Sequence, residues 1–390
     1  MDTLRTLCPR YDVVIVGARC AGAATAMLLA RAGLDVLLVD RQAYGTDTMS
    51  THALMRAGVL QLSRWGLLPT VMAEATPAIR TTTFHYGGEE VSVKIKPEHG
   101  VEYLCAPRRT VLDRILVDAA RGAGAEVRHG VSLIDLERGP GNRITGVRLQ
   151  NGSGDPIVVG CDVVIGADGR LSRVAQLVQA RTLLQSSSSS CCVYGYFEGL
   201  EQDGSHWHFV ENAAAGVIPT NHGQHCVFAS VPGPTFRTTF RGNIKRGFAE
   251  VLQANSRTLG EKVARARLVD RLRGFAGAPG HMRQSFGSGW ALVGDAGYFK
   301  DPLTAHGITD ALRDAELLAS AVINGGPDRL SGYQTVRDAL SRALFRITDS
   351  IASFQWNLEE VKELHAELSA AMKSETNHLV GLSQVPPLAA

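Results

Sequence analysis

The chain has 390 residues, of which 45% are hydrophobic and 20% charged, and its 40 basic and 38 acidic residues give a net charge of +2. This length suffices for two or three domains with large cores, and the balanced charge argues against nucleic acid as a partner. Without a leading apolar run or eighteen uninterrupted apolar residues, we expect no secretion signal, no membrane span and a cytoplasmic protein. Seven cysteines without metal-binding spacing predict reduced thiols and no metal site.

The chain opens on a β-α-β pattern. Residues 11–16 are a short apolar run that predicts a strand, and residues 21–32, rich in Ala, Leu and Met, predict a helix that Gly33 ends. Residues 34–39 predict a second strand, which runs into Asp40. A unit of this length is typical of dinucleotide-binding folds.

The first turn of this unit carries a dinucleotide fingerprint with one departure. Gly17 suits the tight turn and Gly22 the close packing of helix on strand, but Arg19 stands where a second glycine is usual. The helix N-terminus still offers free amides to a pyrophosphate, and Asp40 can accept hydrogen bonds from the adenosine ribose. The residues that we expect to contact the nucleotide here are Gly17, Ala18, Arg19, Cys20, Ala21, Gly22, Asp40 and Arg41.

Further elements of the first region follow in chain order. Residues 110–122 predict a second helix and residues 126–129 another strand. Residues 144–150 and 157–161 predict a hairpin, and residues 162–165 a separate buried strand.

A change of texture at residues 186–231 marks a second region, where short alternating runs predict an antiparallel sheet. The five serines of residues 186–190 cannot build a core, so we expect a mobile surface connection at its border. An apolar strand at residues 290–293 returns the chain to the first region. Helical spacing after about residue 330 predicts a C-terminal helical layer.

Two later motifs indicate which cofactor is bound. Asp168-Gly169 follows a buried strand, and Gly294-Asp295-Ala296-Gly297 is followed by Asp301-Pro302 and Gly307. This pattern resembles the FAD-dependent monooxygenases of the para-hydroxybenzoate hydroxylase type, whose wider relatives include flavin-dependent halogenases and geranylgeranyl reductases. The resemblance spans about residues 11–318, although between residues 186 and 284 it lies in architecture more than in motifs.

The resemblance implies FAD as the cofactor, and each motif receives a role. Asp295 would bind a ribityl hydroxyl, Pro302 would shape the floor beside the ring, and the helix start at Gly307 and Ile308 would point amides at the isoalloxazine. Asp168 and Gly169 would serve FAD and are implicated in nicotinamide use. Arg56 and Arg109 match family arginines that reach the FAD, although solvated helix-end charges are the alternative for both.

We therefore expect an α/β (α+β) fold with a Rossmann-type FAD-binding domain, an inserted antiparallel-sheet substrate domain and C-terminal helices. The FAD-binding domain would comprise residues 1–75, 100–185 and 282–330, the substrate domain residues 76–99 and 186–281, and the helical segment residues 331–390.

The substrate would lie between the flavin and the antiparallel sheet. Tyr194 and Tyr196 share one face of a strand, and Trp207 and Phe209 share one face of the next, so all four are candidate wall residues, with aromatic core as the alternative. His306 precedes Gly307, so we expect its ring near the flavin edge as a catalytic group, together with Pro302. His52 and His85 are further candidates for the pocket.

The leading functional hypothesis is a monooxygenase that uses NAD(P)H and O2 to hydroxylate a small aromatic molecule through a flavin C4a-hydroperoxide, as a monomer or homodimer. One alternative is a reductase or dehydrogenase of the geranylgeranyl reductase type. A halogenase would need a Trp-rich motif and a catalytic lysine that we do not locate. A catalytically idle flavoprotein is the last alternative.

Overall fold

The first sheet grows from the expected β-α-β unit, and the computed structural model of the chain describes residues 7–50, 52–325 and 328–382. In this unit α1 (Cys20–Arg31) joins two parallel strands. The strands follow the order β17 (Phe286–Gly287), β18 (Trp290–Leu292), β8 (Ile157–Gly166), β1 (Arg10–Val16), β2 (Val36–Asp40) and β5 (Glu126–His129). The expectation about the start of the chain falls partly on residues 1–6, which lie outside this description.

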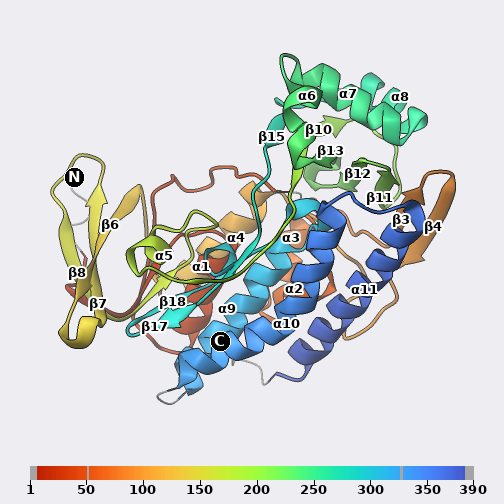
Figure 1. Cartoon of the computed structure of the whole chain (residues 1–390). Helices are drawn as coiled ribbons and strands as arrows, with labels where there is room; N and C mark the ends of the chain where they lie inside the picture. Colours follow the sequence, from red (N-terminus) through yellow and green to blue (C-terminus); the bar gives the residue numbers. More distant parts are fainter. Residues whose placement is uncertain (1–6, 51, 326–327, 383–390) are drawn as a thin grey trace.

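One sequence-based boundary in this sheet is wrong. The expected hairpin strand and buried strand form a single strand, β8, which pairs with β7 (Ile144–Asn151) over its first residues and with β1 from Gly160 to Gly166. Strand β6 (Val131–Arg138) pairs with β7 and completes an antiparallel ribbon at one end of the molecule (Figure 1). Because β8 has apolar residues on both sides, the sequence contains no break between its two halves.

Helices cover the first sheet and the end of the chain. α1, α4 (Arg109–Gly122) and α9 (Gly307–Asn324) pack together against one face. The smaller helices around the sheet are α2 (Arg56–Arg64), α3 (Leu68–Ala73) and α5 (Arg173–Leu177). Two long helices, α10 (Arg329–Ala352) and α11 (Leu358–Val380), form the expected C-terminal layer (Figure 1). α11 begins with a capping box, in which Asn357 and Glu360 exchange side-chain to backbone hydrogen bonds.

The second sheet is mixed rather than antiparallel throughout. Its order is β14 (Arg267–Leu268), β10 (Ser190–Glu198), β13 (His225–Pro232), β12 (Ala213–Pro219), β11 (Ser205–Val210), β3 (Thr81–Tyr86) and β4 (Glu89–Lys94), with β15 (Arg273–Phe275) also on β10. Strands β3 and β11 run parallel, with His85 opposite His208. More than a hundred residues of chain separate them, so no hairpin imposes antiparallel pairing.

Both faces of the second sheet are covered. Along β10, Tyr194 and Tyr196 face the side of α10 and α11, whereas Val193 and Phe197 face α7 (Ile244–Asn255) and α8 (Arg257–Arg265). α6 (Phe236–Phe240) lies beside these two helices (Figure 1). A third, small sheet of β19 (Tyr298–Phe299), β16 (His281–Arg283) and β9 (Thr182–Gln185) joins the two regions.

The run of five serines is held at several points, which corrects the expectation of a mobile connection. The backbone amides of Ser187 and Ser188 donate to the carboxylate of Asp349 on α10. Ser190 is buried, and its amide and hydroxyl both donate to Asp301, at 2.6 Å each. Composition predicts that this run builds no core, but it does not reveal carboxylates that bind it from elsewhere in the chain.

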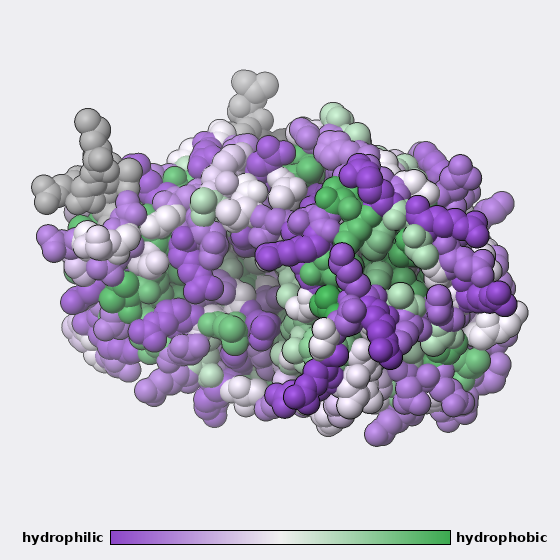
Figure 2. Space-filling model, turned by 90° about the horizontal axis from the view of Figure 1, so that it is seen from above, coloured by the Kyte–Doolittle hydropathy of each residue, from purple (hydrophilic) through white to green (hydrophobic). Residues whose placement is uncertain are grey.

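The face of the molecule seen from above is mostly polar (Figure 2). Figure 2 shows a face covered largely by hydrophilic residues, with hydrophobic residues in separate clusters. Within the described residues, no helix combines the length and apolar character needed to cross a membrane.

Candidate functional site

A pocket with a mixed polar and apolar lining, hereafter the cofactor pocket, lies where the first sheet meets the N-terminal ends of α1 and α9. It has a volume of about 400 Å³ and is lined by Cys20, Ala21, Arg109, Asp295, Pro302 and Gly307, among others. The carboxyl ends of β1 and β8 open toward it, which is the usual position of a ligand in a parallel sheet.

The glycine turn at the start of α1 has the geometry that a nucleotide needs. Gly17 has φ +108°, and a Cβ there would lie 2.4 Å from the carbonyl oxygen of Ala167. A Cβ at Gly22 would lie 1.8 Å from the carbonyl oxygen of Gly17, so helix and strand pack too closely for any side chain. Both predicted glycine roles therefore have a steric cause.

Arg19, the departure from the fingerprint, points its side chain away from the helix axis. Its guanidinium forms an ion pair with Asp113, at 2.9 Å, and donates to the backbone and hydroxyl of Thr46. No side chain caps α1, so its first amides stay available to an anion. Ala18, Arg19, Cys20 and Ala21 all lie at this helix start.

Asp40 sits at the end of β2, as the sequence predicts. Its carboxylate accepts hydrogen bonds from the amides of Ala18 and Gln42, both at 2.7 Å, so it braces the glycine turn. It also lines a small recess beside the turn, together with His129. A carboxylate has further lone pairs, so the role of Asp40 toward a ribose stays a prediction. The neighbouring Arg41 is exposed.

Asp295 is a carboxylate without a protein partner. Burial raises its pKa to about 6, although the cations Arg109 and Lys300 oppose this shift. The described residues donate no hydrogen bond to it, yet it lines the cofactor pocket. Arg109 lines the pocket as well and is held by Asp113 at 2.9 Å. A half-buried carboxylate that faces a pocket without a protein donor fits a ligand that brings hydroxyl groups.

The start of α9 forms the other wall of the cofactor pocket. Asp301 caps the short turn that follows it by accepting from the amide of Leu303, and Ala305 adopts a left-handed conformation with φ 49°. α9 then begins at Gly307 without a side-chain cap, so its first amides are free. Pro302, Gly307 and Ile308 line the pocket. Two uncapped helix starts, a glycine cradle and an unpaired carboxylate together fit FAD.

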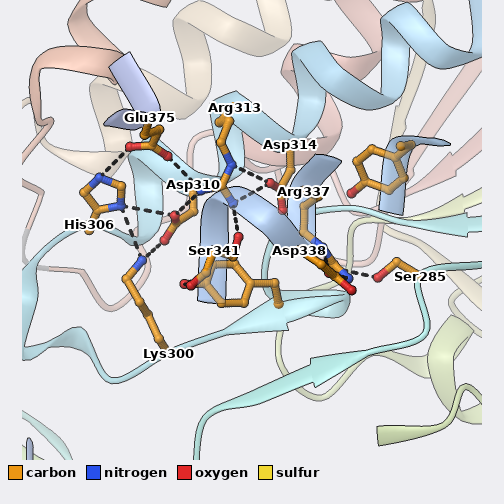
Figure 3. A network of polar contacts seen from close by, with 12 residues as sticks. Ser285, Lys300, His306, Asp310, Arg313, Asp314, Arg337, Asp338, Ser341 and Glu375 are labelled. Carbon is orange, nitrogen blue, oxygen red and sulfur yellow. Dashed lines mark hydrogen bonds and ion pairs between the residues drawn. The ribbon is translucent and has the colours of Figure 1, made fainter. Parts of the chain in front are cut away.

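His306 is not at the pocket surface, contrary to the sequence-based expectation for its ring. It is 1% exposed, and its two ring nitrogens face different carboxylates, with Nδ1 3.1 Å from Asp310 and Nε2 3.0 Å from Glu375 of α11. The residue lies inside a network of buried charges (Figure 3). A direct contact of this ring with the cofactor is not supported by the arrangement, and a catalytic role stays a prediction.

The buried network joins α9, α10 and α11. Lys300 forms an ion pair with Asp310, and Arg313 contacts Asp310, Asp314 and Glu375 at distances of 2.7–3.0 Å (Figure 3). Burial lowers the pKa of Lys300 to about 7. His306, Asp310 and Glu375 could in principle hold a metal ion, but Lys300 and Arg313 already neutralise the carboxylates. The arrangement is therefore an ion network that borders the cofactor pocket through Lys300 and Asp310.

Two other residues that were predicted to contact the cofactor form hydrogen bonds away from the cofactor pocket. The guanidinium of Arg56 donates to the backbone carbonyls of Lys96, Glu98 and Val101. The carboxylate of Asp168 accepts from the hydroxyl of Ser172 and from two amides at the start of α5. Neither residue lines the cofactor pocket, although Gly169 does. Their contact with FAD stays a prediction.

A second space, hereafter the apolar cavity, adjoins the cofactor pocket. It measures about 430 Å³ and lies between the second sheet and α11, with Ala53 shared by both spaces. Trp207 and Phe209 line it, as the sequence predicts for wall residues. Tyr194 lines the cofactor pocket instead. Tyr196 lines neither space and instead contacts His52 and the guanidinium of Arg108.

α11 contributes a wall of the apolar cavity that was not predicted from the sequence. Leu368, Met372 and His365 line the apolar cavity from this helix. Their helical spacing with Val361 could have predicted a buried stripe containing one histidine. His85, by contrast, points to the other face of the sheet and stacks on His208, with ring centroids 4.0 Å apart.

Sequence comparisons place the chain among known proteins. The profile of the family described as "FAD binding domain" matches residues 10–348. A digeranylgeranylglycerophospholipid reductase of Methanothrix thermoacetophila is 28% identical over 355 residues, which cover 87% of this chain and 86% of the relative. A menaquinone reductase of Mycolicibacterium smegmatis is 26% identical and covers 84% of this chain and 80% of its own length.

Solved structures agree with the fold. The flavin-dependent brominase Bmp2 superposes with a TM-score of 0.79 at 16% identity and covers 94% of each chain. A probable FAD-dependent monooxygenase of Pseudomonas aeruginosa, pqsL, gives a TM-score of 0.78 at 20% identity, over 93% of this chain and all of its own. At such identities these likenesses establish the architecture and leave the reaction open.

Proposed function

The chain belongs to the FAD binding domain family and is an FAD-dependent oxidoreductase, and on that premise we propose that it reduces a carbon–carbon double bond in a largely apolar substrate. The apolar cavity carries this proposal. Its volume of about 430 Å³ lies in the range of small-molecule sites. Because it shares Ala53 with the cofactor pocket, a molecule inside it can reach the bound cofactor.

The lining of the cavity favours a hydrocarbon body. Leu54, Ile79, Val91, Phe209 and Met372 stand on different elements and turn apolar groups toward the same space. Removal of apolar surface from water is the main driving force that such a wall can offer a ligand. A substrate with an isoprenoid or similar chain suits it better than a small polar acid.

Reduction is favoured by the sequence relatives. Two of them carry the names of reductases, and both names denote molecules with isoprenoid chains. FAD, when bound, supplies the two-electron chemistry. The residues of this chain would hold the cofactor through Asp295 and the Gly17 turn, orient the substrate, and exclude water with the apolar walls.

Hydroxylation of an aromatic compound is the second candidate. Phe84, Tyr86, Trp207 and Phe209 line the cavity and would accommodate an aromatic ring. This reaction would consume O2 as well as a reductant. NAD(P)H is the proposed reductant in both cases.

A single-turnover experiment separates the two reactions. FAD-loaded protein, reduced with dithionite under argon, is mixed with geranylgeraniol and, separately, with 4-butylphenol. We expect anaerobic reoxidation of the flavin by geranylgeraniol and a product that has gained two hydrogen atoms. A product that gains one oxygen atom, and only after oxygen is admitted, would replace reduction by hydroxylation.

The substitution Trp207→Ala tests whether the cavity is the substrate site. It removes a large aromatic wall, so we expect the concentration for half-maximal reoxidation to rise about tenfold or more while FAD content stays unchanged. Trp356→Phe is the matched control, because Trp356 is buried outside the cavity lining. Equal effects of both substitutions would contradict the assignment.

A further inference from the structure

We propose that Tyr86 and His365 form a binding site for one polar group, a hydroxyl or a carbonyl oxygen, on an otherwise apolar substrate. The inference rests on the proposed function, because both residues line the apolar cavity. Tyr86 belongs to β3 and His365 to α11, and the hydroxyl of Tyr86 lies 2.9 Å from Nδ1 of His365. The pair therefore bridges the two walls of the cavity.

Most other polar side chains of the cavity wall are already paired. The hydroxyls of Thr82 and Ser205 bond to each other at 2.9 Å. Thr304, which lines the cavity, bonds at 3.2 Å to Thr348, which does not. Lys362, at the rim, is held by Glu89 at 2.7 Å. The indole N–H of Trp207 and the exposed hydroxyl of Ser369 also have unused hydrogen-bonding capacity, but the Tyr86–His365 pair joins the sheet to α11 and can both donate and accept.

The count of protons on the pair leaves one donor free. His365 lies among aromatic rings, 4.5 Å from Phe209 and 5.4 Å from Phe84 between centroids. Burial lowers the pKa of His365 to about 4 and raises that of Tyr86, so both are neutral near pH 7. Together they carry one N–H and one O–H, and their mutual hydrogen bond uses one of the two.

The tautomer decides where the free donor sits but not whether it exists. If Tyr86 donates to Nδ1, the proton on Nε2 of His365 is free; if Nδ1 donates, the hydroxyl proton of Tyr86 is free. No described residue bonds to Nε2. The pair also keeps one acceptor in either state. It can thus bind a carbonyl through one bond or a hydroxyl through two.

A purely structural purpose explains the pair poorly. α11 is already fastened by Val361 and Leu368 in the core and by Glu375 in the buried network. The free donor makes no hydrogen bond to any described residue and is not among the fully enclosed polar atoms, so a molecule in the cavity can reach it. An apolar side chain would dock the helix equally well, so the retained donor points to a ligand with a polar atom, such as a prenyl alcohol, a phenol or a quinone.

Binding of two matched probes tests the inference without turnover. 4-Butylphenol and butylbenzene differ only in the hydroxyl, and their dissociation constants for the FAD-loaded protein are measured by calorimetry. We expect His365→Phe to weaken binding of 4-butylphenol about tenfold and to change that of butylbenzene less than about twofold. Ser374→Ala, at an exposed position of α11 outside the cavity lining, is the matched control and should leave both values unchanged.

The outcomes separate this inference from the proposed function. If both probes bind and the ratio of their dissociation constants is the same in His365→Phe, the pair is structural and the inference is overturned, whereas the apolar-substrate proposal stands. If butylbenzene does not bind the unsubstituted protein, both fail. Tyr86→Phe keeps the ring and removes only the hydroxyl, so it supplies the same comparison should His365→Phe not fold.

Discussion

The cofactor pocket and the apolar cavity adjoin each other, but they depend on their lining residues in different ways. The cofactor pocket depends on individual positions, such as Gly17, where a Cβ would lie 2.4 Å from a carbonyl oxygen, and Asp295, a carboxylate without a protein partner. The apolar cavity depends on a shared property, because leucine, valine, methionine and phenylalanine from many elements supply the same apolar surface.

This difference teaches which parts of a site a sequence can reveal. A residue required for its backbone angle or its charge cannot be exchanged, so it appears as a motif with fixed spacing. Apolar wall residues exchange readily at similar volume, so they leave only a periodic pattern. The lining of the apolar cavity is therefore harder to predict from the sequence than the lining of the cofactor pocket.

The prediction with the largest expected effect tests whether the buried network stabilises both the cofactor pocket and the wall of the apolar cavity. The buried network touches the cofactor pocket at Lys300 and Asp310 and reaches α11, the cavity wall, at Glu375. Arg313→Met leaves three buried carboxylates short of a cation. We expect the free energy of unfolding, from urea titration, to fall by about 3–5 kcal/mol.

A surface arginine provides the control for this experiment. Arg246 forms an exposed ion pair with Glu250, and its replacement by methionine should leave the free energy of unfolding nearly unchanged. If Arg313→Met is no more destabilising than Arg246→Met, the network does not support the two regions. Glu375→Gln, a smaller change, applies the same test should Arg313→Met fail to fold.

The second prediction concerns the cofactor pocket alone. Asp295→Ala removes the carboxylate that faces the pocket, so we expect FAD affinity to fall roughly a hundredfold. The purified variant should be nearly colourless, as judged by flavin absorbance relative to protein absorbance. Asp162→Ala, at an exposed position of β8, should keep its FAD. Normal FAD content in Asp295→Ala would contradict the assignment, whereas binding of butylbenzene should survive.

The smallest expected effect is a dependence of stability on pH. The folded-state pKa of Asp295 is about 6, above the ordinary value of 3.8, so folding disfavours its ionised form. This group therefore lowers the stability of the cofactor-free protein as the pH rises from about 4 to about 6, and the loss persists above that range. Because asparagine cannot ionise, the substitution Asp295→Asn removes this dependence of stability on pH.

We accordingly expect cofactor-free Asp295→Asn to exceed the cofactor-free parent by roughly 1–3 kcal/mol at about pH 8 and to match it at about pH 4. Thermal unfolding at both pH values checks the difference. A stability gain that is equal at the two pH values would mean that ionisation of Asp295 is not its cause.

Much of the first region could be predicted from the sequence. The expected β-α-β unit agrees with β1, α1 and β2 to within two residues at each end, and the strand at Glu126–His129 has the expected bounds. These elements are local, because a strand, a glycine turn and an alanine-rich helix can each be predicted from a short stretch of sequence. The FAD-binding family follows from the same motifs.

The remaining features depend on contacts between distant segments. The parallel pairing of β3 with β11 and the bonds from Asp349 to the serine run join parts of the chain more than a hundred residues apart. His306 was expected at the flavin edge, but Glu375, on the last helix, holds its ring inside the network. No local sequence pattern predicts such partners.

The position of α11 at the end of the described chain also bears on the order of synthesis. Every residue named here in the cofactor pocket leaves the ribosome before Glu375 and His365 do. A nascent chain could thus assemble the flavin site first, while His306 and Arg313 still face water. The apolar cavity would be closed only when α11 arrives, so the cofactor pocket can form before the cavity wall is complete.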